Sequence, residues 1–205
     1  VKAVKEDFAG QTLEYRGETY ELSLAGSYQT ENAALALDAL DVLNHKGYPT
    51  TVGQRKKGLR ETKWNGRLTI IHRDPLFIVD GAHNPAAADM LEDSVRKYFK
   101  GRNMYFIMGV FRDKDYSYII RELCPYAEQI VTIETPDNPR ALPAQELAEA
   151  VRECNPHVQA AENIQDAVNK VFAMADREDV ILSFGSLSFI GEITTIVKNR
   201  EEKNL

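Results

Sequence analysis

Short apolar segments alternate with amphipathic segments along most of this 205-residue sequence, from about Trp64 onward. The apolar segments include Leu76–Val79, Met104–Met108 and Val180–Ser183. After each one, apolar residues recur at every third or fourth position, which is the spacing of an amphipathic helix. Apolar strands that alternate with such helices form parallel sheets, because the helices cross over and cover both faces. The sequence therefore predicts an α/β fold with a mostly parallel, Rossmann-like sheet and helices on both faces.

The residues before Trp64 follow a different pattern. Short strands separated by glycines are expected over residues 3–24, and a helix over residues 30–46. Residues 51–54 have the pattern of a capping box, which opens a second, shorter helix. This region is predicted to be a partial segment of short strands plus two helices.

These patterns divide the chain into two expected domains. Residues 1–63 contain too few elements to bury much apolar surface alone, so we expect them to be the end of a domain that begins upstream. Residues 64–205 are expected to form the Rossmann-like domain. The sequence starts at Val1 without an initiating methionine or a signal-peptide pattern, so we expect it to begin inside a longer protein.

Composition narrows the classes of partner. Hydrophobic residues make up 43% of the sequence and charged residues 27%, which is sufficient for a packed core. The net charge is −6 and no long basic run occurs. The one short basic cluster, Gln54–Arg60, is expected to be the solvated face of a helix. Nucleic acid is therefore not expected as a main partner, since neutralising phosphates requires clustered Lys and Arg.

Membrane insertion and metal binding find no support in the sequence. No apolar stretch approaches the ~20 residues that a membrane-spanning helix requires. Cys124 and Cys154 lack the spacing of a zinc site, and we interpret them as reduced thiols of a cytoplasmic protein.

One motif directly follows the first buried strand, at Asp80–Pro85. Ligands of parallel sheets bind beyond the carboxyl ends of the strands, where Asp80 is expected to accept hydrogen bonds from hydroxyls or to face a cation. His83 precedes a helix N-terminus, which favours anions. Asn84 and Pro85 are typical of an N-cap and of the first helical position. The residue types alone leave two interpretations open, a binding site or simple caps of a turn and a helix.

Three further features carry weaker signals. Gly185 and Ser186 follow an apolar strand and could offer N–H groups and a hydroxyl to an anion, or Ser186 could be an ordinary N-cap. Arg67 could hold a phosphate through a bidentate fork, although a single Arg is more often a surface charge. The loop Gly109–Asp115 could bind a ligand, but a charged helix start is the favoured interpretation.

Taken together, the motifs resemble those of the folylpolyglutamate synthase/dihydrofolate synthase family, a branch of the Mur-type ATP-dependent amide ligases. The resemblance extends over nearly the whole chain, and its blocks occur in the order of the family. Those blocks are Leu24–Leu37, Trp64–Leu68, Asp80–Pro85, Met108–Gly109 with Asp113–Asp115, and Gly185–Leu187.

The resemblance implies roles for five residues. Asn32 would lie near the adenine of ATP, Arg67 would reach the phosphates, and Asp80 would contact the ribose. His83 and Ser186 would line the site where glutamate and the reacting phosphate meet, with His83 and Arg67 as catalytic residues. In the family, two domains close over ATP across a hinge, which would lie here near residue 64, and the first segment would belong to the central ATPase domain.

The sequence departs from the family pattern in three respects. Tyr28 stands where the family usually has His, and Asn65 stands where it usually has Pro. No Gly-x-x-x-x-Gly-Lys-Ser/Thr phosphate-binding loop occurs in the sequence. The Mg²⁺ ligands and the modified lysine of the family are expected upstream of these residues. We therefore expect the chain to carry half of an active site, to bind ATP weakly alone and to be inactive by itself.

The expected reaction joins L-glutamate to a folate or pteroate through an acyl phosphate made with ATP, in an enzyme that is a monomer when intact. One alternative is a stand-alone α/β module that binds a nucleotide or an amino acid without catalysis. A second alternative treats Asp80 and His83 as metal ligands of a hydrolase, for which no third ligand occurs at a convincing spacing.

Overall fold

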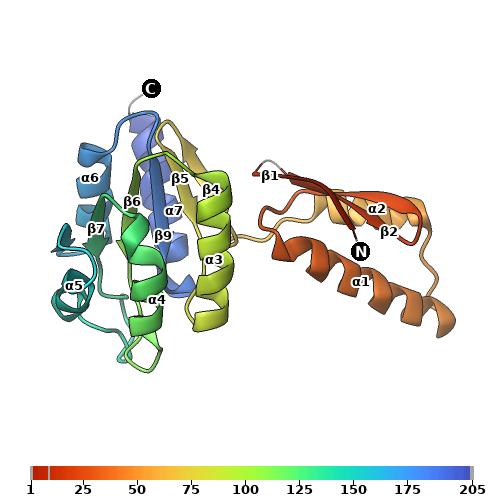
Figure 1. Ribbon diagram of the computed structural model, residues 1–205, viewed down its shortest axis with the longest axis horizontal. Helices are drawn as coiled ribbons and strands as arrows, with labels where there is room; N and C mark the ends of the chain where they lie inside the picture. The colour runs from red at the N-terminus through yellow and green to blue at the C-terminus, as the bar shows by residue number, and fades with distance from the viewer. Residues whose placement is uncertain (1, 9, 204–205) are drawn as a thin grey trace. The chain divides into compact units, whose positions relative to one another are not determined.

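The computed structural model describes residues 2–8 and 10–203. The chain forms two compact units, divided between Arg67 and Leu68 (Figure 1). The sequence predicts a boundary slightly earlier, between residues 63 and 64. Arg67 belongs to the first unit, where it lines a cavity. Four residues of the predicted domains lie outside the described residues: Val1, Ala9, Asn204 and Leu205.

The first unit is a three-stranded antiparallel sheet that packs on helices. Alternate residues of the central strand turn toward α1, so one face of the sheet is apolar while the other remains solvated. The elements are β1 (Lys2–Asp7), β2 (Gly10–Tyr15), β3 (Glu18–Leu22), α1 (Tyr28–His45) and α2 (Val52–Glu61). The core consists of Leu13, Tyr15, Tyr20, Leu22, Ala33 and Leu37.

Helix α2 begins with the capping box that the sequence predicts. The Thr51 hydroxyl accepts a hydrogen bond from the Gln54 N–H at 3.2 Å, and the Gln54 side-chain oxygen accepts one from the Thr51 N–H at 2.8 Å. Its basic run is mostly exposed, as expected, with one exception. The Arg55 side chain is 8% exposed, and its Nη1 lies 2.5 Å from Oδ1 of Asp41 on α1.

The second unit is built on a six-stranded sheet with the strand order β4-β5-β9-β6-β7-β8. All neighbouring strands run parallel except β4, which pairs antiparallel with β5 at one edge. The predicted mostly parallel sheet is therefore confirmed. The strands are β4 (Thr69–Arg73), β5 (Leu76–Val79), β6 (Met104–Met108), β7 (Gln129–Thr132), β8 (Val158–Ala160) and β9 (Val180–Phe184).

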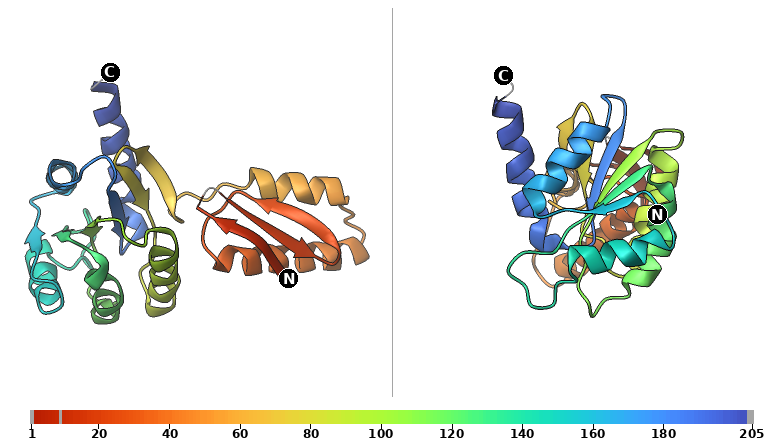
Figure 2. Two further views of the ribbon diagram at one scale, coloured as in Figure 1. Left: turned by 45° about the horizontal axis from the view of Figure 1, so that its top comes forward. Right: turned by 90° about the vertical axis from the view of Figure 1, so that its left-hand side faces the viewer.

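Helices cover both faces of this sheet, also as predicted. Figure 2 shows α3, α4 and α5 on one face and α6 and α7 on the other. Strand β9 is buried throughout and β6 is buried except at Tyr105, because both faces of these central strands meet a helical layer. The helices are α3 (Pro85–Tyr98), α4 (Tyr116–Leu123), α5 (Ala144–Arg152), α6 (Ile164–Met174) and α7 (Ile190–Lys203), with 3₁₀ turns at Cys124–Tyr126 (η1) and Leu187–Phe189 (η2).

Two local expectations are wrong. The helical spacing of Ala87, Met90, Leu91 and Val95 predicts Met90 on the inward face of α3. Met90 is 44% exposed, because the inward stripe passes through Ala88, Leu91 and Val95. The sequence after β9 also predicts a single helix from Ser186 to Lys198. Instead η2 precedes α7, because Ser186 caps a short 3₁₀ turn before the α-helix begins.

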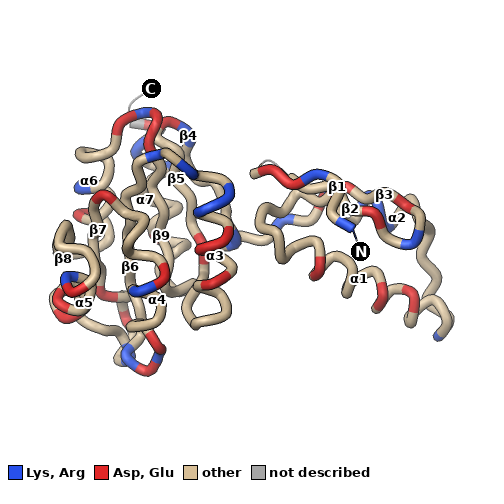
Figure 3. Tube along the Cα trace, in the orientation of Figure 1, with Lys and Arg blue, Asp and Glu red and all other residues tan. Residues whose placement is uncertain are grey.

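The surface carries both signs of charge. Figure 3 shows Lys and Arg interspersed with Asp and Glu along both units. Within the described residues, no helix combines the length and the apolar character needed to cross a bilayer.

Candidate functional site

Three loops leave the sheet of the second unit side by side. Strand β9 lies between β5 and β6, and all three are parallel. The Asp80 N–H donates to the Ser183 carbonyl at 2.9 Å, and the Gly109 N–H donates to the Phe184 carbonyl at 3.3 Å. The residues that follow these strands therefore gather at one edge of the sheet, as the carboxyl-end rule predicts.

Asp80 is the buried anchor of this edge, with 4% exposure. Its Oδ1 accepts a hydrogen bond from the Ala82 N–H at 2.8 Å, and its Oδ2 accepts one from the Leu68 N–H at 2.9 Å. A buried carboxylate is stabilised by such N–H donors. These bonds fix the turn after β5 to the residue that precedes β4. The structure thus gives Asp80 a capping role.

His83 lies in the same turn, half-buried, with one ring nitrogen fixed. Its Nδ1 lies 2.8 Å from the Gly81 carbonyl oxygen. A carbonyl oxygen only accepts hydrogen bonds, so Nδ1 must carry the proton and donate it. In the neutral ring, Nε2 then holds the lone pair. This tautomer can accept a proton at Nε2 from a bound group.

The turn ends in the N-terminus of α3, as the sequence predicts. The Asn84 Oδ1 accepts a hydrogen bond from the Ala87 N–H at 2.9 Å, and Pro85 is the first helical residue. His83 is consequently held next to a helix N-terminus.

Ser186 follows β9 and is almost fully buried, with 3% exposure. Its Oγ accepts a hydrogen bond from the Ser188 N–H at 3.2 Å and lies 2.6 Å from the Ser188 Oγ. Ser186 is therefore the N-cap of η2, the ordinary interpretation that the sequence left open. The pair of hydroxyls lies in the loop adjacent to the one that carries His83.

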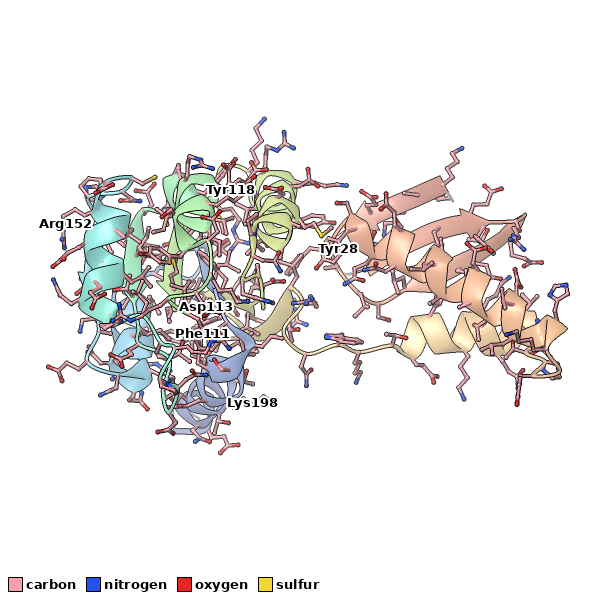
Figure 4. All side chains as sticks on the ribbon, turned by 90° about the horizontal axis from the view of Figure 1, so that it is seen from below. Tyr28, Phe111, Asp113, Tyr118, Arg152 and Lys198 are labelled. Atoms are coloured by element: carbon pink, nitrogen blue, oxygen red, sulfur yellow. The ribbon has the colours of Figure 1, made fainter. Side chains whose placement is uncertain are left out.

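The loop Gly109–Asp115 begins a charged helix, the interpretation favoured from sequence. Asp115 Oδ1 accepts a hydrogen bond from the Tyr118 N–H at 3.1 Å and caps α4. Arg140 binds Asp113 through Nε and Nη2, at 3.1 and 2.6 Å, and its guanidinium lies 4.9 Å from the centre of the Phe111 ring. Figure 4 labels Phe111 and Asp113 on this loop.

A second bidentate ion pair joins this loop to α5. Arg112 contacts both carboxylate oxygens of Glu146, at 2.8 and 3.0 Å. The hydrogen bond from Arg112 lowers the pKa of Glu146, and the hydrogen bond from Arg140 lowers the pKa of Asp113. Sequence reasoning missed both partners, because Arg140 and Glu146 lie far along the chain from the loop.

The first unit contains a cavity of about 450 Å³, within the range of small-molecule sites. It brings together Asn32 and Arg67, two of the five predicted site residues. Asn32 Nδ2 donates to Gln29 Oε1 at 3.1 Å, and Arg67 Nη1 donates to the Gly66 carbonyl at 3.3 Å. The lining residues are Leu22, Leu24, Tyr28, Gln29, Asn32, Ala33, Ala36, Leu59, Thr62, Trp64 and Arg67.

The predicted site residues thus fall into two groups. Asn32 and Arg67 line the cavity of the first unit, while Asp80, His83 and Ser186 lie in adjacent loops of the second. The described residues contain no group of three or more His, Cys, Asp or Glu side chains arranged to hold a metal ion.

Comparison with known proteins identifies a family that matches the region containing these loops. Residues 66–187 match the family described as Mur ligase, glutamate ligase domain. The chain is 28% identical to the dihydrofolate synthase/folylpolyglutamate synthase of Bacillus subtilis, over 94% of its own length and 44% of that protein. It is 32% identical to the folylpolyglutamate synthase of Lacticaseibacillus casei, over 60% of its length and 29% of that protein.

A solved structure extends the similarity to the fold. The folylpolyglutamate synthase of Mycobacterium tuberculosis, crystallised with ADP and AMPPCP, superposes with a TM-score of 0.78 at 27% identity. The match covers 98% of this chain and 47% of that one. The chain thus spans less than half the length of the relatives that it matches.

Proposed function

We infer the function of this chain from its family, since it belongs to the Mur ligase family, whose glutamate ligase domain matches residues 66–187. We propose that the chain is part of an ATP-dependent ligase that adds L-glutamate to a folate or pteroate. The observation that carries the proposal is the shared edge where β5, β9 and β6 end. That edge places Asp80, His83 and Ser186 in adjacent loops, all inside the matched region.

The proposed reaction has two steps. A carboxylate oxygen of the folate or pteroate attacks the γ-phosphorus of ATP, the bond to the β-phosphate oxygen breaks, and ADP leaves. The glutamate amine then attacks the acyl carbon, the bond from carbon to the phosphate oxygen breaks, and the amine loses a proton. The products are an amide, ADP and phosphate. Such chemistry depends mainly on positioning and on stabilising negative charge.

Within this scheme the cavity of the first unit receives the nucleotide base. Its volume and its largely apolar lining suit a planar ring with a polar edge. Asn32 would hydrogen-bond that edge, and Arg67 at the wall would reach toward the phosphates. Residues 1–67 would then belong to the central ATPase domain of the ligase.

The loops of the second unit would meet glutamate and the reacting phosphate. His83 would accept the proton of the glutamate amine at Nε2, the nitrogen left unprotonated by its bond to Gly81. The Ser186 hydroxyl would bind glutamate. Asp80 would contact the ribose while it holds the turn.

The remaining requirements of the reaction complete the proposal. The phosphate-binding loop, the Mg²⁺ ligands and the modified lysine would come from the rest of the ligase, since the sequence lacks the loop motif. Mg²⁺ would neutralise charge on the phosphates. We place the ligase in the cytoplasm as a monomer.

Calorimetry on the purified chain distinguishes this proposal from a stand-alone binding module. The ligase part should bind ADP weakly and glutamate not measurably, and it should form no amide from ATP, glutamate and dihydropteroate. Tight binding of a nucleotide or of glutamate by the chain alone would favour the module. ATP-dependent ligation by the chain alone would contradict the need for the rest of the ligase.

A chimera tests the activity itself. In the Bacillus subtilis relative, the region aligned with this chain would be replaced by this chain. The chimera should incorporate glutamate into a folate only in the presence of ATP, and a chimera that folds and binds ATP without doing so would contradict the proposal.

A further inference from the structure

The ring of Tyr28 is fixed in place by the loop that precedes α1. Gly26 in this loop has a φ of +101°, a conformation that L side chains rarely adopt. A Cβ at Gly26 would lie 2.7 Å from Cε1 of Tyr28, so the ring packs directly against the bare backbone. Figure 4 labels Tyr28 at the N-terminal end of α1.

A buried side chain from the sheet holds this loop. Gln11 is 3% exposed, and its Nε2 donates to the carbonyls of Leu24 and Gly26 at 2.9 and 2.6 Å. The Gly26 carbonyl also accepts from the Gln29 N–H at 2.9 Å. The position of the Tyr28 ring is therefore determined by β2 and by the first turn of α1.

The cavity that this ring lines combines three kinds of chemistry. Aliphatic side chains such as Leu22, Leu24 and Leu59 make up much of its wall. Tyr28 and Trp64 contribute aromatic surface, and Asn32 contributes an amide. A largely apolar cleft with aromatic walls and the neighbouring amides of Gln29 and Asn32 suits a flat heteroaromatic ring, because such a ring stacks through its faces and hydrogen-bonds through its edge.

We propose that Tyr28 is a nucleotide-binding residue of this cavity and supplies the surface on which a purine base stacks. This inference rests on the proposed function, which provides the nucleotide. The ring lies against Gly26 on one side and lines the cavity, so it presents a fixed aromatic surface that loses little freedom on binding.

The fluorescence of one residue can report ligand binding in this cavity. Trp64 is the single tryptophan of the chain and is one of the residues that line the cavity. Its fluorescence would be titrated with ADP, adenosine and ribose 5-phosphate on the 205-residue chain. Adenosine carries the base without phosphates, and ribose 5-phosphate carries a phosphate without the base.

Two substitutions at Tyr28 separate the effect of its aromatic face from the effect of its apolar volume. Tyr28→Phe keeps the aromatic face, whereas Tyr28→Leu keeps an apolar side chain and removes the face. Tyr48 is 68% exposed and does not line the cavity, so Tyr48→Leu is the matched control. Circular dichroism and thermal unfolding would establish that each variant is folded.

The expected result is a loss specific to the base. Tyr28→Leu should weaken ADP and adenosine binding alike by at least about fivefold, the factor that corresponds to the weaker end of base stacking on aromatic side chains. Tyr28→Phe and Tyr48→Leu should bind both within about twofold of the unsubstituted chain.

Two results would overturn the inference in distinguishable ways. If Tyr28→Leu binds adenosine and ADP as tightly as the unsubstituted chain, the inference is wrong while the proposed function stands. If the unsubstituted chain binds neither compound, by fluorescence and by equilibrium dialysis at millimolar concentrations, the nucleotide cavity and the inference are both wrong.

Discussion

Gly185 packs directly against the backbone of Gly109, so closely that no Cβ fits between them. Gly185 has a φ of +110°, which only glycine adopts without strain. A Cβ on Gly109 would in turn lie 2.8 Å from Cγ1 of Ile133. Each of the adjacent strands β9 and β6 is thus followed directly by a glycine, and the close approach of the two glycines holds Ser186 beside the neighbouring loops.

Replacement of Gly185 by alanine should therefore destabilise the second unit. We expect a loss of about 2 kcal/mol or more, from left-handed backbone strain and from overlap with Gly109. Urea unfolding followed by circular dichroism would measure it. Gly191→Ala is the matched control, because a Cβ there meets open space within α7, and it should leave the protein equally or slightly more stable.

Removal of the Asp80 carboxylate should also cost stability. Asp80→Ala leaves the N–H groups of Leu68 and Ala82 without their acceptors, at an expected cost of about 2 to 4 kcal/mol. Asp80→Asn retains one carbonyl oxygen and should lose less. The midpoints of urea unfolding would be compared, and an Asp80→Ala midpoint equal to that of the unsubstituted protein would show that the buried bonds contribute nothing.

His83 should matter for chemistry and not for folding. In the chimera with the Bacillus subtilis relative, His83→Ala should lower the rate of glutamate incorporation by about 100-fold or more, the usual range for a general base. The melting temperature should change little, because the ring is only half-buried and is held by a hydrogen bond within its own turn, to Gly81. His83→Gln provides a polar control, and wild-type rates in both variants would remove His83 from the mechanism.

The ion pair between Asp113 and Arg140 should persist well into the acid range. The hydrogen bond that Arg140 donates to Asp113 lowers the pKa of Asp113 below the ordinary value of 3.8. A lowered carboxyl pKa means that the pair is fully formed above the ordinary pKa and is lost only as the pH falls through the lowered one.

An NMR titration of the Arg140 Nε–H signal would test this order of events. The signal should keep its position from neutral pH down to pH 3.8 and shift only below it. Asp113→Asn should abolish the shift. A shift centred above pH 3.8 would mean that the pair is not formed in solution.

The regular elements of the second unit could be predicted because their signals are local. The apolar runs Leu76–Val79 and Met104–Met108 coincide with β5 and β6 at both ends. The Thr51 capping box and the Asn84 cap also depend only on near neighbours, and the structure confirms both.

Properties that depend on distant residues could not be predicted. Arg55 resembles its basic neighbours on α2, and only the fold brings it to Asp41. Met90 is as apolar as Leu91, but the rotation of α3 against the sheet decides which of them is buried.

The candidate site also combines features that the sequence predicts with features that depend on distant residues. The placement of Asp80 and Ser186 at one edge follows from strand order, which the alternation of strands and helices suggests. The hydrogen bonds that occupy Asp80, and the cavity that unites Asn32 with Arg67, require coordinates.

The most direct test of the proposed ligase is mass spectrometry of a folate recovered from the chimera with the Bacillus subtilis relative. With ATP and L-glutamate present, the folate should gain one glutamyl residue per turnover, with stoichiometric release of ADP and phosphate. A folded chimera that binds ATP and leaves the folate at its original mass would contradict the assignment.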